Sequence, residues 1–203
     1  MVNRFFYTWL ILGLMFSAGS VAFAQSSSDE KAAEVRELLV ERDQEIKRVV
    51  GDRSTFTDEQ RERLKNVVNG GIDFEAMART ALGPFWADLS TDERDEFVNV
   101  FSSIVRNQSL SNLDVYRSEV SFEKITVSGD TARAVTTTVY RGVPTTVEYV
   151  LGLKNGSWRV NDIILDDVST AEGYARSFQT VVRRRGFESL MESLRKKLAT
   201  MES

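Results

Sequence analysis

The stretch WRVNDIILDDVSTAEGYARSF, residues 158–178, places an extended strand directly before a helix. Because side chains alternate between the two faces of a strand, one face is expected to carry Trp158, Val160, Asp162 and Ile164. Ser169, followed three residues later by Glu172, has the pattern of a capping box, which predicts that a helix begins there. One stripe of that helix is apolar, with Tyr174, Phe178, Val181 and Val182.

Four runs rich in Val, Thr, Ile and aromatic residues predict strands over 119–127, 131–141, 145–154 and 157–166. The connections Ser128-Gly129-Asp130, Gly142-Val143-Pro144 and Asn155-Gly156 have the composition of turns. Such short links require antiparallel neighbours. The sequence therefore predicts a four-stranded antiparallel meander.

Helical patterns lie on both sides of these strands. Capping boxes at Ser27, Thr57 and Ser90, together with a cap at Asp73, predict four helices before the sheet. The first ends near Val50, the second at Gly70-Gly71 and the third at Gly83-Pro84. The fourth amphipathic stretch continues to Leu113 and Tyr116. Two more helices, 169–185 and one after Gly186, close the chain, so we expect an α+β domain whose helices wrap a curved sheet as a cone.

The N-terminus has the pattern of an export signal. Arg4 precedes an apolar run from Phe5 to Phe16, and Ala22-Phe23-Ala24 is a small-x-small cleavage site. The run is too short for a membrane span, which needs about 20 residues. We expect cleavage after Ala24, which removes residues 1–24 and leaves 25–203 as a single domain.

Composition excludes several classes of chemistry. The chain has no His and no Cys, so it can build neither a Ser-His-Asp system nor an ordinary zinc site. Loss of the signal takes away one cation and no carboxylate, so the net charge goes from −4 to −5. A mildly acidic exported chain is a poor binder of nucleic acid.

Several polar features have structural and functional readings. Asp166 and Asp167 precede the helix at Ser169, where its dipole favours negative charge. Asp162 shares an apolar face and needs a partner such as a Tyr hydroxyl, an Arg or backbone N–H groups; in an enzyme it would be a general base. Arg183-Arg184-Arg185 either ends a solvated helix or contacts phosphate headgroups or an acidic partner.

Two segments of the chain resemble the MlaC (Ttg2D, toluene-tolerance) family. The first is Trp158 and Asp162, then Val168-Ser169, then Tyr174 and Phe178. The second is DFEAMARTALG, residues 73–83, followed by Trp86. Phe97, Phe101, Tyr116, Leu190 and Leu194 extend the match along the mature chain. Asp167 and Ala175 depart from the family, which usually has Gly and Arg at these two places.

The resemblance implies a periplasmic carrier of a phospholipid, without a cofactor and without enzymatic activity, which we expect to be a monomer. Its partners would be an outer-membrane lipoprotein complex and an inner-membrane ABC transporter with an MCE-type subunit, and its role would be to maintain outer-membrane lipid asymmetry. We expect the acyl chains to contact Met77, Leu82, Phe97, Phe101, Ile104, Val147, Tyr149 and Leu151. The alternatives are a hollow-cone enzyme that uses Asp162, a carrier of another apolar ligand such as a hopanoid, and a binding protein with a solid core.

Overall fold

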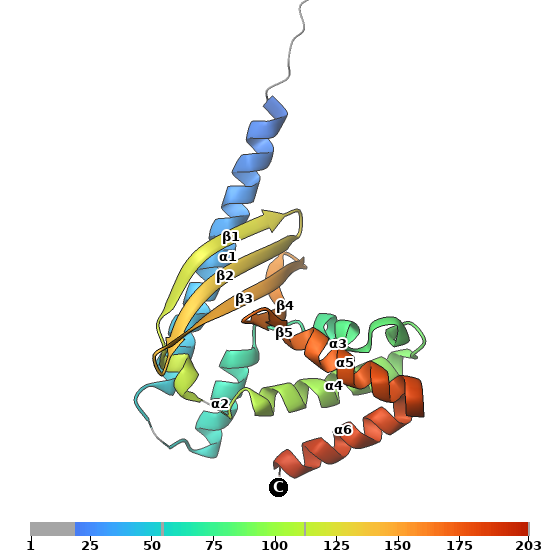
Figure 1. Cartoon of the computed structure of the whole chain (residues 1–203). Coiled ribbons are helices and arrows are strands. Elements are labelled where there is room, and N and C mark those ends of the chain that lie inside the picture. Colours follow the sequence, from blue (N-terminus) through green and yellow to red (C-terminus); the bar gives the residue numbers. More distant parts are fainter. Residues whose placement is uncertain (1–18, 54, 112, 203) are drawn as a thin grey trace, which may run out of the picture.

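The computed structural model describes residues 19–53, 55–111 and 113–202. Its elements follow the predicted order of helices, strands and helices (Figure 1). Before the sheet come the elements α1 (Gly19–Val50), α2 (Asp58–Asn69), α3 (Phe74–Leu82), η1 (Gly83–Trp86), α4 (Thr91–Gln108) and η2 (Leu113–Arg117). The strands are β1 (Val120–Ser128), β2 (Thr131–Tyr140), β3 (Val143–Lys154), β4 (Ser157–Leu165) and β5 (Val168–Ser169). The chain then forms α5 (Thr170–Arg185) and α6 (Phe187–Glu202).

The predicted helix caps at four residues are present. The Thr57 hydroxyl accepts from the backbone N–H of Gln60, whose side chain accepts from the backbone N–H of Thr57. Ser90 forms the same reciprocal box with Glu93. Asp73 caps α3 through the N–H of Ala76, and Ser169 caps α5 through the N–H of Glu172.

The predicted cap at Ser27 is wrong for the full chain. Helix α1 begins at Gly19 and runs through Ser27 and Glu30 without a break. An N-cap satisfies the N–H groups of a first helical turn, and a helix that already runs upstream leaves no such groups to satisfy. The predicted signal segment falls partly outside the described residues, since residues 1–18 are not described.

The helical stretch predicted to reach Tyr116 is also shorter than expected. Helix α4 ends at Gln108, and Leu113 and Tyr116 belong to the separate 3₁₀ turn η2. The Tyr116 hydroxyl donates to the Ser109 carbonyl at 3.0 Å, just past the end of α4. The carbonyls at a helix end lack partners within the helix, and this contact supplies one of them from outside.

The sheet has five antiparallel strands in the order β1-β2-β3-β4-β5. The β2–β3 turn is Arg141-Gly142, both with positive φ, so Val143 and Pro144 start β3 and do not form the turn that was predicted. Two consecutive left-handed residues match the turn of a tight hairpin. Asp166 and Asp167 form the β4–β5 turn in the same way, with φ of 44° and 65°. The two-residue strand β5 was not predicted.

A β-bulge corrects the predicted face of β4. Leu151 pairs with Val160, but its neighbour Val150 pairs with Asp162, so one residue of β4 is extra. Because a one-residue shift reverses the alternation of side chains, Asp162 and Ile164 lie on the face opposite to Trp158 and Val160.

Two packed layers result. Helix α1 covers one face of the sheet, called here the inner face, where Val35 and Leu39 pack with Ala134 and Leu151. Helices α3 to α6 form a second cluster below the sheet in Figure 1, called here the helical cluster. The two layers meet at Ile72, which contacts both clusters and forms a β-bridge with Val160.

Candidate functional site

The eight residues predicted to contact acyl chains divide between the two layers. Five are buried in the helical cluster: Met77, Leu82, Phe97, Phe101 and Ile104. The other three lie on β3, on the inner face of the sheet, where Leu151 is buried and Tyr149 and Val147 are half-buried. Val147 is in neither apolar cluster. The structure thus brings together the first five and, separately, the last three.

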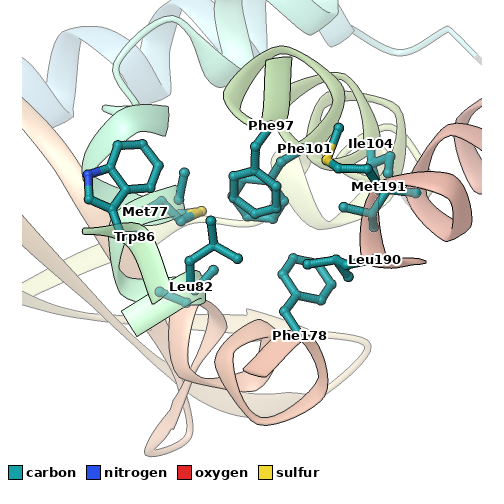
Figure 2. Close-up of a cluster of buried hydrophobic side chains, with 13 residues drawn as sticks. Met77, Leu82, Trp86, Phe97, Phe101, Ile104, Phe178, Leu190 and Met191 are labelled. Carbon is teal, nitrogen blue, oxygen red and sulfur yellow. The ribbon is translucent and has the colours of Figure 1, made fainter. Parts of the chain in front are cut away.

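The helical cluster is closely packed (Figure 2). The rings of Phe97 and Phe101 stack at 5.6 Å between centroids, and Phe178 meets both edge-on at 6.0 and 5.8 Å. The five predicted residues in this cluster are each at most 1% exposed. Their side chains are therefore surrounded by protein atoms, and a ligand between them would require the helices to separate.

Unlike the helical cluster, the inner face of the sheet is partly open near the β2–β3 turn, where four apolar residues form a row. Tyr149 pairs with Ile163, and Val147 pairs with Leu165. Tyr149, Val147 and Ile163 are half-buried, and Leu165 is 47% exposed. This inner-face row of Val147, Tyr149, Ile163 and Leu165 therefore offers apolar surface that the protein itself does not cover.

Two buried tyrosine hydroxyls lie at one end of the row, those of Tyr149 and Tyr116. Burial raises the pKa of Tyr149 to about 12, and the Asp43 carboxylate on α1 adds to the shift. Burial also raises the pKa of Tyr116 to about 12, with Tyr149 adding to it while the bond to Ser109 acts the other way. The burial that raises both pKa values shows that these hydroxyls lie among protein atoms at one end of the row.

Sequence reasoning missed three contributors to this surface. Ile163 and Leu165 were assigned to the opposite face, because the bulge in β4 leaves no clear mark in the sequence. Tyr116 was taken for part of a long helix, although it stands in η2. A search for a break in the apolar pattern after Val105 could have separated Tyr116 from α4.

Asp162 is a structural carboxylate at the start of α5. One oxygen accepts the backbone N–H groups of Ile163 and Ala171, at 2.9 and 3.0 Å. The other accepts the Ser169 hydroxyl, while Thr170 donates to the Ile163 carbonyl at 2.7 Å. Backbone N–H groups were among the partners expected for it, and they tie β4 to the first turn of α5.

The three consecutive arginines that the sequence singled out lie on the surface. The side chains of Arg183, Arg184 and Arg185 are exposed at the last turn of α5, where cations complement the helix dipole. Within the described ranges, no group of three or more acidic residues could hold a metal ion. In the same ranges, none of the helices combines the length and the apolar character that a membrane crossing needs.

Two surface depressions lie away from the predicted acyl-chain residues. One of about 690 Å³ lies between α2 and the end of α4, with Arg61, Lys65 and Gln108 among its lining residues. The other, of about 330 Å³, lies between α1 and the β3–β4 turn and includes Arg42 and Arg159. None of the eight predicted residues lines either depression.

Comparisons with known proteins identify a family and, separately, a shared fold. The family model described as MlaC protein matches residues 42–196. A phospholipid-binding protein from Ralstonia solanacearum, solved in complex with a phospholipid, superposes with a TM-score of 0.69 at 18% identity, over 84% of this chain and 98% of that one. A comparison with curated proteins finds no match. At this identity the superposition shows a shared fold, and the family model shows kinship along most of the chain.

Proposed function

We propose that this chain, which belongs to the MlaC family, binds a phospholipid and carries it through the periplasm. Its route would run between an outer-membrane lipoprotein complex and an inner-membrane ABC transporter with an MCE-type subunit, and the transport would maintain lipid asymmetry in the outer membrane. The observation that carries the proposal is the family match over residues 42–196. The fold shared with a phospholipid-binding protein supports it.

The energetics of acyl chains explain why such a carrier is needed. Each CH₂ group taken out of water is worth about 0.8 kcal/mol, so a diacyl lipid does not cross an aqueous space unaccompanied at a useful rate. An apolar site in the carrier matches the bilayer interior, which makes transfer between the two nearly neutral. The apolar side chains of the inner-face row meet this requirement.

We assign the acyl chains first to the inner-face row, because its side chains reach free space in this structure. Val147 and Tyr149 are the two predicted residues in it. The five predicted residues of the helical cluster would then pack the helices that flank the row. They would contact the lipid only if these helices separate.

A tryptophan at Val147 tests this assignment. A larger ring on the row would displace part of an acyl chain. The loss of only two buried CH₂ groups, about 1.6 kcal/mol, corresponds to roughly a fifteenfold lower affinity. Native mass spectrometry of protein purified without detergent, followed by lipid extraction, would measure the bound phospholipid per chain. We expect Val147→Trp to hold far less lipid than the wild type.

The matched control is Val150→Trp, on the same strand but on the outer face, where Val150 pairs with Asp162. It is also half-buried, so it tests the effect of the added ring without touching the row. Equal lipid content in the two variants would reject the row as the acyl site. A wild-type protein without phospholipid, before and after incubation with liposomes, would reject the carrier itself.

Export can be tested separately. We predict that the protein recovered from the periplasm starts at Gln25, because cleavage follows Ala24. The described contacts between α1 and the sheet begin after this point, for example where the Ser28 hydroxyl donates to the Val127 carbonyl at 3.3 Å. The shortened chain should therefore keep the fold. Intact mass and N-terminal sequencing would show the start, and an uncleaved chain would contradict it.

A further inference from the structure

Exposed apolar side chains gather at one end of the molecule. Among the side chains that the structure describes, six large apolar residues are exposed, and only Met201 lies away from this end, on α6. Val143 follows the β2–β3 turn, and Leu165 and Val168 flank the β4–β5 turn, all on the inner face. Val139, which pairs with Pro144, is exposed on the outer face. Val115 belongs to η2, directly before β1. Single exposed apolar residues are ordinary, but a contiguous patch marks an interaction site.

The strand-tip patch is made of Val115, Val143, Leu165 and Val168, and its three strand residues continue the inner-face row. On β3 the same face carries Tyr149, Val147 and then Val143, because alternate residues share a face. Leu165 pairs with Val147 on one side and with Val168 on the other. An apolar path therefore runs from the half-buried Tyr149 to Val143 and Val168, which are 61% and 58% exposed.

The charges at the β4–β5 side of the patch are acidic, while beside Val115 the charges of Asp114 and Arg117 form an ion pair. Asp166 and Asp167 stand exposed between Leu165 and Val168, and Glu119 is exposed beside β2, where its carbonyl accepts the Thr138 hydroxyl at 3.0 Å. The cation in the turn itself is Arg141, whose guanidinium lies 5.0 Å from the centre of the Tyr140 ring. An acidic rim disfavours an anionic bilayer surface and complements a basic one.

We propose that the strand-tip patch is a docking surface for a partner protein whose contact face is apolar at its centre and basic at its rim. The proposal rests on the carrier function above, because a lipid that leaves along the inner-face row must pass this end without meeting water. Docking covers the exposed valines and joins the apolar path to that of the partner. The carboxylates at the rim orient the approach.

The test uses the periplasmic domain of the MCE-type transporter subunit from the same organism as the probe. Val143→Glu and Val168→Glu place a charge in the patch at residues that are 61% and 58% exposed. Met201→Glu is the matched control, an exposed apolar residue outside the patch. We expect each patch variant to lower the affinity for the probe at least tenfold, as measured by biolayer interferometry, and the control to match the wild type. The bound phospholipid, measured by native mass spectrometry, should not change in any of the three.

Asp167→Asn tests the acidic rim alone. Asparagine tolerates the left-handed backbone that Asp167 adopts, so the turn is kept while the charge is lost. We expect slower association with the probe and a weaker dependence on salt.

Three results would overturn the proposal: unchanged affinity in the patch variants, no binding by the wild type, or binding to vesicles of phosphatidylethanolamine and phosphatidylglycerol that the patch variants lose. A wild type that holds no phospholipid but still needs the patch to bind the probe would refute the carrier function and leave the docking surface standing.

Discussion

At the residue scale, Asp162 shows how a carboxylate that looks catalytic in the sequence can serve the fold. Two backbone N–H groups and the Ser169 hydroxyl donate to its two oxygens. These contacts join β4 to the first turn of α5. They give Asp162 a structural role that requires no catalytic function.

We therefore predict that Asp162→Ala lowers the stability of the fold and abolishes no catalytic activity. Removal of a capping carboxylate leaves its hydrogen-bond donors without their acceptor, which costs about 1 to 2 kcal/mol of unfolding free energy. Urea unfolding would measure the change, with Asp162→Asn as the milder variant because its amide oxygen can still accept the N–H groups. A stable Asp162→Ala protein that had lost the turnover of an apolar substrate would instead support the enzyme alternative.

At the element scale, a small ion network joins the β3–β4 turn to α3. The Lys154 ammonium lies 2.9 Å from Asp73 and 3.0 Å from Glu75. Burial alone would raise the pKa of Asp73, but the bond from Lys154 and the N–H of Ala76 outweigh it and lower the pKa. The bond from Lys154 also lowers the pKa of Glu75, and the two carboxylates raise the pKa of Lys154.

The directions of these pKa shifts predict the pH range in which Lys154→Met destabilises the fold. Carboxyls with a lowered pKa stabilise the fold above their ordinary values of 3.8 and 4.5, and this contribution fades as the pH falls further. The ammonium contributes fully below its ordinary pKa of 10.5 and less above it. Because Lys154 is 48% exposed, we expect a cost of at most about 1 kcal/mol at pH 7.

The measurement is the difference in unfolding free energy between wild type and Lys154→Met from pH 2 to pH 11. It should be largest near neutral pH and shrink toward both extremes. Lys124→Met, an exposed lysine on β1, is the control and should show little difference. A difference independent of pH would mean that lost packing, and not the ion network, causes the effect.

At the scale of the whole molecule, the proposed binding of a phospholipid to the folded chain predicts that the lipid stabilises the fold. A ligand that binds only the folded state adds about 2.7 kcal/mol at a concentration one hundred times its dissociation constant. For a domain of this size that corresponds to a rise in melting temperature of about 5 to 10 °C. Calorimetry of protein stripped of lipid and then reloaded would measure it. Equal melting temperatures would argue for a solid core that holds no lipid.

Much of the fold was predictable from local patterns. The caps at Thr57, Asp73, Ser90 and Ser169 depend on a few adjacent residues, and each was placed correctly. The Asn155-Gly156 turn and the four long strands follow from composition in the same way. The family could also be recognised, because its signature depends on residue order, and the family model confirms it.

The site was harder to predict because it depends on which residues face one another. Apolar spacing identified Phe97 and Val147 alike, but only the packing of helices and sheet put the first in a closed cluster and left the second half-open. A single extra residue in β4 moved Asp162 off the inner face and put Ile163 on it.

The sequence by itself determined most of the elements, their order and the family, since these follow from short-range hydrogen bonding and periodicity. The tertiary structure decided the faces, the two clusters and the exposed strand tips, because burial is a property of elements packed together and is not carried by any residue alone.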